Sequence, residues 1–167
     1  MPDGSIMLSF SQKSMVSVDL QRSEGMVRQK LLPVKKQLEQ WCQASCIHPA
    51  VNICIQQHQQ NAKKKLRVTV RLVDENESAH LNHTYRKKNQ PTNILSFPFE
   101  SFDGKKTPYL GDLVICVKVL EREAKEQEKD FISHYTHIMI HGFLHLLGFD
   151  HIEAEDASKM EAIEIEI

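Results

Sequence analysis

The stretch HGFLHLLGFDH, residues 141–151, constrains the fold more than any other part of the sequence. His141 and His145 are four residues apart, so in a helix their side chains project side by side from one face. Gly148 can adopt the left-handed conformation that ends a helix, which lets the chain turn and bring His151 back toward the pair. The spacing therefore predicts a helix that ends near Gly148, with three imidazoles converging on one point.

Three converging imidazoles are typical of a metal site. A single histidine at helical spacing is more often a half-buried packing residue. The combination of a spaced pair, a helix-ending glycine and a third histidine favours metal binding instead. Neutral imidazole suits zinc, and three protein ligands with an open fourth position are typical of catalytic zinc. We therefore predict that His141, His145 and His151 bind one Zn²⁺ per chain.

The same spacing occurs in the metzincin peptidases, whose motif is H-E-x-x-H-x-x-G-x-x-H. In those enzymes the glutamate acts as the general base on the metal-bound water, but this chain has Gly142 at that position. A glycine cannot take a proton. A metallopeptidase is therefore a minor alternative, which needs a base from elsewhere in the chain.

Two segments resemble signatures of the YbeY family, the bacterial endoribonucleases of rRNA maturation. Residues 141–151 resemble H-G-x-L-H-L-x-G-Y-D-H, with Phe149 in place of the usual tyrosine. Residues 81–100, LNHTYRKKNQPTNILSFPFE, resemble a segment in which L-N-x-x-Y-R leads through a polar loop to T-N-V-L-S-F-P. The resemblance extends over residues 16–167 and is most specific in these two blocks.

The resemblance implies a zinc-dependent endoribonuclease that is specific for single strands. It implies a role in rRNA processing at the 3′ end of 16S rRNA, in ribosome biogenesis and in ribosome quality control. The expected partners are single-stranded rRNA, the small ribosomal subunit, one of its ribosomal proteins and the GTPase Era. The main alternative is a non-catalytic ribosome-assembly factor with a structural metal.

Arg86 is the second candidate catalytic residue besides His141. Alone, Arg86, Lys87 and Lys88 would be an ordinary charged helix end, but the resemblance implies that Arg86 faces the metal site. Its planar fork can hold two phosphate oxygens and offset the charge that grows on them in the transition state. We predict RNA contacts at Arg86, Lys87 and Lys88. No general base is evident in the histidine motif, so either a metal-bound hydroxide attacks directly or a substrate group assists.

Composition limits the class of protein and its compartment. With 167 residues, 41% hydrophobic and 26% charged, the chain has the size and composition of one soluble domain. Its net charge of -1 provides no general field for nucleic acid, so RNA contacts must come from a local patch. The four cysteines show no C-x-x-C pair, which favours packing roles and a cytoplasmic location. No apolar run approaches the ~20 residues of a membrane-spanning helix.

The hydrophobic pattern predicts alternating strands and helices, and hence an α+β or α/β domain over residues 16–167. The resemblance adds a small mixed sheet packed with helices, with the metal in a cleft at one edge, and we predict the α+β class. Residues 1–15 are predicted to be a flexible extension and 54–65 a surface loop. Strands are expected at 16–20, 66–73, 93–97 and 111–117, and helices at 33–45, 74–85, 118–130 and 155–167.

Overall fold

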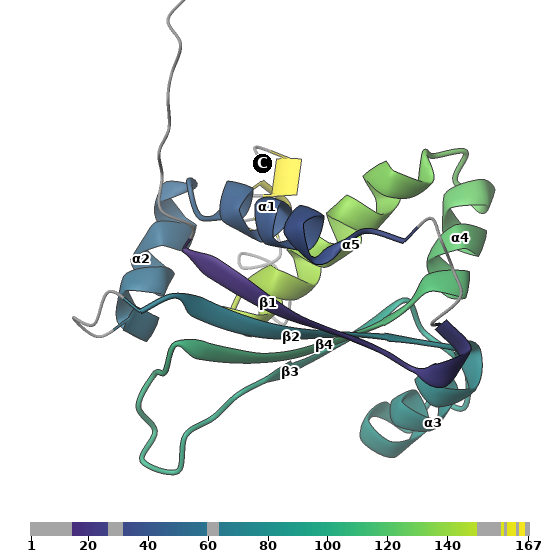
Figure 1. The fold of residues 1–167 in the computed structure, drawn as a ribbon, viewed down its shortest axis with the longest axis horizontal. Coiled ribbons are helices and arrows are strands. Elements are labelled where there is room, and N and C mark those ends of the chain that lie inside the picture. The colour runs from purple at the N-terminus through teal and green to yellow at the C-terminus, as the bar shows by residue number, and fades with distance from the viewer. Residues whose placement is uncertain are drawn as a thin grey trace, which may run out of the picture.

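A four-stranded mixed sheet lies at the centre of the molecule (Figure 1). The computed structural model describes residues 15–26, 32–59, 64–149, 158, 160–162 and 164–165. The strand order is β1-β2-β4-β3. β1 pairs with β2 in parallel, β2 pairs with β4 in parallel, and β3 is an antiparallel edge strand on β4. The strands are β1 Val16–Arg22, β2 Leu66–Val73, β3 Ile94–Pro98 and β4 Tyr109–Cys116.

Helices cover the sheet unequally. α1 and α5 lie on one face, whereas α3 lies beyond the opposite face (Figure 1). The large core lies between the sheet and the helices α1 and α5. A smaller cluster, which includes Val73, Leu95 and Val114, is separate from it. The helices are α1 Lys35–Ser45, α2 Pro49–Gln59, α3 Glu75–Arg86, α4 Val117–Glu126 and α5 Phe131–Leu146, with a short 3-10 helix at Glu24–Met26.

The sequence pattern of β2 explains this layering. Leu66, Val68, Val70 and Leu72 alternate along the strand and are all buried in the large core, as predicted. The fold is thus the predicted single α+β domain with a small mixed sheet. The described residues near the C-terminus, from Ser158 onward, are helical, in agreement with the predicted closing helix.

Three expectations need comment. The predicted loop over 54–65 is wrong in its first half, because α2 continues to Gln59. Val51 and Ile55, one turn apart, anchor α2 in the core, and glutamine is a good helix former despite its polarity. The helix expected at 118–130 is present as α4 but ends at Glu126, and it buries one face, including Val119 and Leu120. Most of the predicted extension, residues 1–14, lies outside the described residues.

α5 lies close against the sheet at Gly142. A Cβ built there would lie 2.4 Å from Cδ1 of Ile94 on β3 and 3.0 Å from Cδ2 of Leu113 on β4. Both of these side chains are buried and have little room to move. Position 142 therefore faces the sheet. A glutamate there would enter the core, and this accounts for the glycine at the position where metzincins carry their base.

We expect Gly142→Ala to destabilise the protein. Overpacking costs about 1–3 kcal/mol, which exceeds the roughly 1 kcal/mol that alanine gains over glycine in a helix. The melting temperature should fall by several degrees in a thermal scan. Gly25→Ala is the control, since its new methyl group would meet Asp74 Oδ2 at an ordinary 3.4 Å. An equal or higher melting temperature for Gly142→Ala would show that α5 does not need this close approach.

Candidate metal centre

α5 is fixed at both ends by its own sequence. At its start, the side chain of Asp130 accepts a hydrogen bond from the backbone N–H of Ser133 at 2.9 Å. At its end, Gly148 has φ +97°, and the N–H of Phe149 donates to the carbonyl of Leu144 at 3.1 Å. This is a Schellman ending, as the glycine predicted. The histidines on α5 thus stand on a rigid helix.

His141 and His145 form the centre of the site. Their Nε2 atoms are 3.1 Å apart, and the two rings lie nearly perpendicular with centroids 4.6 Å apart. Both side chains are half-buried. A tetrahedral zinc ion with Zn–N bonds of about 2.0–2.1 Å separates two imidazole nitrogens by about 3.3 Å. The pair therefore fits two corners of a zinc tetrahedron with little rearrangement.

The third predicted ligand, His151, lies outside the described residues. In the part of the chain that is described, no three His, Cys, Asp or Glu side chains are grouped so that they could hold a metal ion. Cys42 and Cys46 are buried packing residues, as predicted, and burial raises the pKa of both thiols. Of the three predicted metal ligands, the structure therefore describes the positions of His141 and His145.

Glu164 joins this pair from the C-terminal segment. Its Oε1 lies 2.6 Å from Nδ1 of His141, on the side of the ring opposite Nε2. Its Oε2 lies 3.8 Å from Nε2 of His137. The Glu164 side chain is only 9% exposed, whereas that of His137 is 52% exposed. Glu164 lies outside the histidine motif, and no spacing rule in the sequence connects it to His141.

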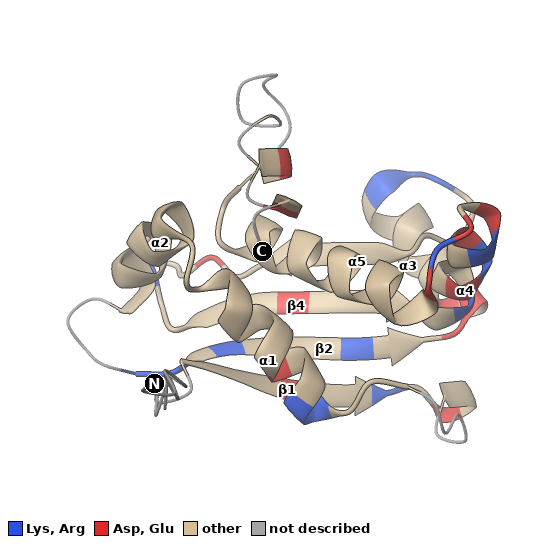
Figure 2. Ribbon diagram, turned by 90° about the horizontal axis from the view of Figure 1, so that it is seen from above, with Lys and Arg blue, Asp and Glu red and all other residues tan. Residues whose placement is uncertain are grey.

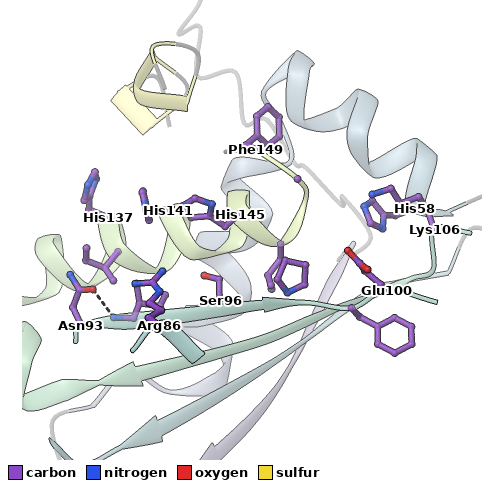
Figure 3. Close-up of a pocket in the computed structure, with 16 residues that line it drawn as sticks. His58, Arg86, Asn93, Ser96, Glu100, Lys106, His137, His141, His145 and Phe149 are labelled. Atoms are coloured by element: carbon purple, nitrogen blue, oxygen red, sulfur yellow. Dashed lines mark hydrogen bonds between the residues drawn. The ribbon is translucent and has the colours of Figure 1, made fainter. Parts of the chain in front are cut away.

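The histidines open into a cavity of about 690 Å³ between α5, β3 and the loop after β3. Figure 3 shows two groups of polar side chains around it. Arg86, Asn93 and His137 lie at one end, and His58, Glu100 and Lys106 lie at the other. His141, His145 and Ser96 lie between them. The cavity thus brings together residues that are far apart in the sequence.

The end of α3 places Arg86 in the cavity. The next residue, Lys87, ends the helix in the left-handed conformation with φ 59°, and its Nζ donates to the carbonyl of Thr84 at 3.1 Å. Lys87 and Lys88 are exposed and do not line the cavity. Of the three predicted RNA contacts, the structure therefore brings only Arg86 to His141. Lys106, which the sequence analysis did not select, lines the same cavity.

Buried polar contacts hold the loop that follows Arg86. Asn82 donates from Nδ2 to the carbonyl of Gln90 at 2.8 Å. Ser78 donates from Oγ to the carbonyl of Thr92 at 2.9 Å and accepts from the backbone N–H of Thr92 at 3.0 Å. These bonds fasten the loop to α3 at two points. They fix both the end of α3 and the start of β3.

A second cluster links α4, α5 and β3 beside the cavity. Nε2 of the buried His134 lies 2.8 Å from Oε2 of Glu123, and Nδ2 of Asn93 lies 3.2 Å from each oxygen of the same carboxylate. Asn93 also accepts from the backbone N–H of Ile94 at 2.6 Å. A partly buried network of this kind holds its members in one arrangement. The network therefore fixes the start of β3, which forms part of the cavity wall.

Comparison with known proteins identifies the family. The family model described as "Endoribonuclease YbeY" matches residues 29–167. The chain belongs to the YbeY endoribonuclease family. It is thus related to enzymes that cut RNA, and the resemblance seen in the sequence is confirmed.

The fold is similar to that of a solved structure. The solution structure of TM1509 from Thermotoga maritima shares 24% sequence identity, with a TM-score of 0.51. The match covers 91% of this chain and 85% of that one. At this identity the similarity supports the fold alone. Among the helices that the structure describes, none combines the length and the apolar character needed to cross a bilayer.

His58 should make the free energy of unfolding depend on pH. Its Nδ1 lies 3.1 Å from the carbonyl of Thr107, so Nδ1 donates, and Nε2 is buried without a partner among the described residues. Burial lowers the pKa of His58 below its ordinary value, although the bond to Thr107 opposes this effect. Between the folded and unfolded pKa values, the unfolded chain binds more protons. The free energy of unfolding should therefore fall as the pH drops below about 6.5.

We expect His58→Asn to reduce this pH dependence. Asparagine keeps an N–H donor near the position of Nδ1 but takes up no proton in this range. Urea titrations between pH 8 and pH 5 should show a smaller loss of stability for the variant than for the parent protein. His83→Asn, at an exposed position on α3, is the control. Parallel stability curves for His58→Asn and the parent would contradict this account.

Proposed function

We propose that the chain is a zinc-dependent endoribonuclease that cuts single-stranded rRNA. Family membership supports RNA cleavage as the reaction. The observation that carries the metal-dependent part is the pair of Nε2 atoms, 3.1 Å apart, on the floor of an open cavity. We place its role in the maturation of the 3′ end of 16S rRNA, in ribosome biogenesis and in ribosome quality control in the cytoplasm.

His141, His145 and His151 are the proposed zinc ligands. When bound, zinc supplies a Lewis acid for a phosphate oxygen and lowers the pKa of a water toward ~7. The chain contributes the remaining functions. The caps of α5 hold the first two imidazoles, and the half-buried position of both rings limits the water around the scissile phosphate.

Arg86 is the residue that we propose to bind the scissile phosphate. Its guanidinium lines the same cavity as His141 and can donate two parallel hydrogen bonds to phosphate oxygens. As negative charge develops on these oxygens, the fixed positive charge of Arg86 stabilises the transition state. Lys106 lines the cavity at the opposite end and can bind a neighbouring phosphate. Together they provide a local cationic track for a strand.

The recessed position of the histidines supports a single-stranded substrate. The His141 side chain is 24% exposed, so a phosphate must enter the cavity to reach it. A single strand can bend its backbone inward and turn its bases away, whereas a duplex presents its phosphates on a stiff outer surface. The small ribosomal subunit, one of its proteins and the GTPase Era are the partners that we propose from family membership.

The two alternatives differ from this proposal in the role of the metal. A ribosome-assembly factor would use zinc for stability and would not cut RNA. A peptidase would require a base near His141, but position 142 faces the sheet, where Ile94 and Leu113 leave no space for an acid. Packing therefore disfavours a metzincin-like base at position 142, and a peptidase would need a base from elsewhere in the chain.

We expect the purified protein to cut single-stranded RNA, and to lose this activity on chelation. His141→Ala should lose both zinc and cleavage. Arg86→Ala should keep its zinc, measured by elemental analysis, but lose about 10²–10³-fold in kcat/KM, the usual cost of one transition-state donor. Arg122→Ala is the control, because Arg122 pairs with Glu75 at the surface, outside the cavity. A matched duplex RNA should be a poor substrate.

Other outcomes would favour the alternatives. If chelation lowers the melting temperature while a rigorously purified sample never cuts RNA, the assembly-factor function replaces the nuclease. If the protein digests casein in a zinc-dependent way, the peptidase is revived. If Arg86→Ala cuts as fast as the parent, the proposed role of Arg86 is wrong.

The proposed RNA contacts of Lys87 and Lys88 are tested by salt dependence. They directly follow Arg86, which lines the cavity, so we propose that they bind the strand beyond the histidines. For single strands, the slope of log affinity against log salt is about -0.7 per phosphate contact, so Lys87→Gln with Lys88→Gln should reduce its magnitude by about 1.4. Lys118→Gln with Lys125→Gln on α4 is the matched control. Equal slopes for both double variants would exclude Lys87 and Lys88 from RNA binding.

A further inference from the structure

We propose that Glu164 is a positioning residue of the metal centre, which holds His141 in the tautomer that binds zinc. The inference rests on the zinc site proposed above and deepens it. Glu164 lies 23 residues from His141 in the sequence, outside the histidine motif, and reaches the ring only through the fold. Glu164 acts through the imidazole of His141, and the property that it changes is the affinity of the site for zinc.

The hydrogen bond between the two residues determines where the imidazole proton lies. An ionised carboxylate can only accept, so at 2.6 Å from Oε1 of Glu164 the Nδ1 atom of His141 must be the donor. In the neutral ring, Nε2 then carries a lone pair. This lone pair is on the side of the ring that faces Nε2 of His145. The carboxylate therefore selects the one neutral tautomer that can bind a metal at the shared point.

The low solvent exposure of Glu164 favours its hydrogen bond to His141. Its side chain is only 9% exposed, and a carboxylate with so little solvent needs a polar partner. The short contact to His141 supplies one, and such charge-assisted bonds are stronger than neutral ones. Its second oxygen faces His137 at 3.8 Å, one turn earlier on α5. The carboxylate thus lies against two successive turns of the helix that carries the metal ligands.

Packing of the C-terminal segment aims Glu164 at this position. Met160, one helical turn earlier, is completely buried in the large core. Residues four apart lie on the same face of a helix, so anchoring Met160 points Glu164 toward α5. Glu161, on another face, is exposed. The same packing that closes the core therefore also completes the site.

A fixed tautomer has a direct effect on metal binding. Without a partner at Nδ1, a neutral imidazole divides its proton between the two nitrogens, and the ring can rotate. Part of the population is then unable to bind. Loss of such a carboxylate partner typically weakens metal affinity by about 10–100-fold.

The first test is a zinc titration in competition with a fluorescent chelator, with zinc alone as the ligand. We expect Glu164→Gln, which keeps the shape but removes the charge, to bind zinc about 10–100-fold more weakly than the parent. Glu161→Gln is the matched control and should bind like the parent. Zinc affinity for Glu164→Gln equal to that of the parent would overturn the inference.

The second test reads the tautomer without any metal. Long-range ¹H–¹⁵N spectra of the zinc-free protein should show the His141 proton on Nδ1 in the parent and a shift toward Nε2 in Glu164→Ala. A residue that only supports the fold would lower the melting temperature and leave this tautomer unchanged, which would also overturn the inference. If Glu164→Ala does not fold, the same spectrum of Glu164→Met, which keeps the bulk but removes the acceptor oxygens, decides, with the melting temperature confirming that it is folded.

These tests separate the inference from the proposed function, because neither uses RNA cleavage as a readout. If the parent binds zinc in a Glu164-dependent way but cuts no RNA, the nuclease proposal fails and the inference stands. If the parent binds no zinc at all, the inference fails, whatever its activity on RNA.

Discussion

The contact between α5 and the sheet at Gly142 determines the rest of the arrangement. Because residue 142 has no side chain, α5 can approach β3 and β4 closely. A Cβ atom at this position would lie only 2.4 Å from Ile94. This approach fixes the rotation of the helix about its axis, because only one face can lie so close. His141 and His145 are then directed along the sheet edge into the cavity, and not into the core. Fold and site are thus set by the same constraint, and the glycine inside the histidine motif has a structural reason.

Helices and strands that are fixed by hydrogen bonds hold each part of the site. α5 is capped at both ends, the end of α3 is tied to the following loop through Ser78 and Asn82, and β3 begins at the Asn93–Glu123–His134 cluster. Sites supported in this way keep their ligands close to the productive geometry before substrate arrives. The two imidazoles already lie at nearly the spacing that zinc requires.

The sequence predicted what depends on neighbours along the chain. The pairing of His141 with His145 and the helix ending at Gly148 follow from helical geometry alone, and both are confirmed. The α+β fold followed from alternating patterns, with the mixed sheet added by the resemblance. Glu164 was missed because its contact is tertiary and no spacing rule connects it to His141. α2 was missed because its second half is polar, and only Val51 and Ile55 among its apolar residues are fully buried.

The net charge of the whole chain says little about its substrate, because the charges that line the cavity differ from the total. The chain carries a net charge of -1, but the charged residues that line the cavity are Arg86, Lys106 and Glu100, which sum to +1. Charged residues of both signs gather on α4 and the turn after it, outside the cavity lining, while α5 carries no Lys, Arg, Asp or Glu (Figure 2). At physiological salt, charges beyond about 8–10 Å are largely screened. A phosphate in the cavity therefore responds to the local cations, and an acidic protein can bind RNA where its basic residues converge.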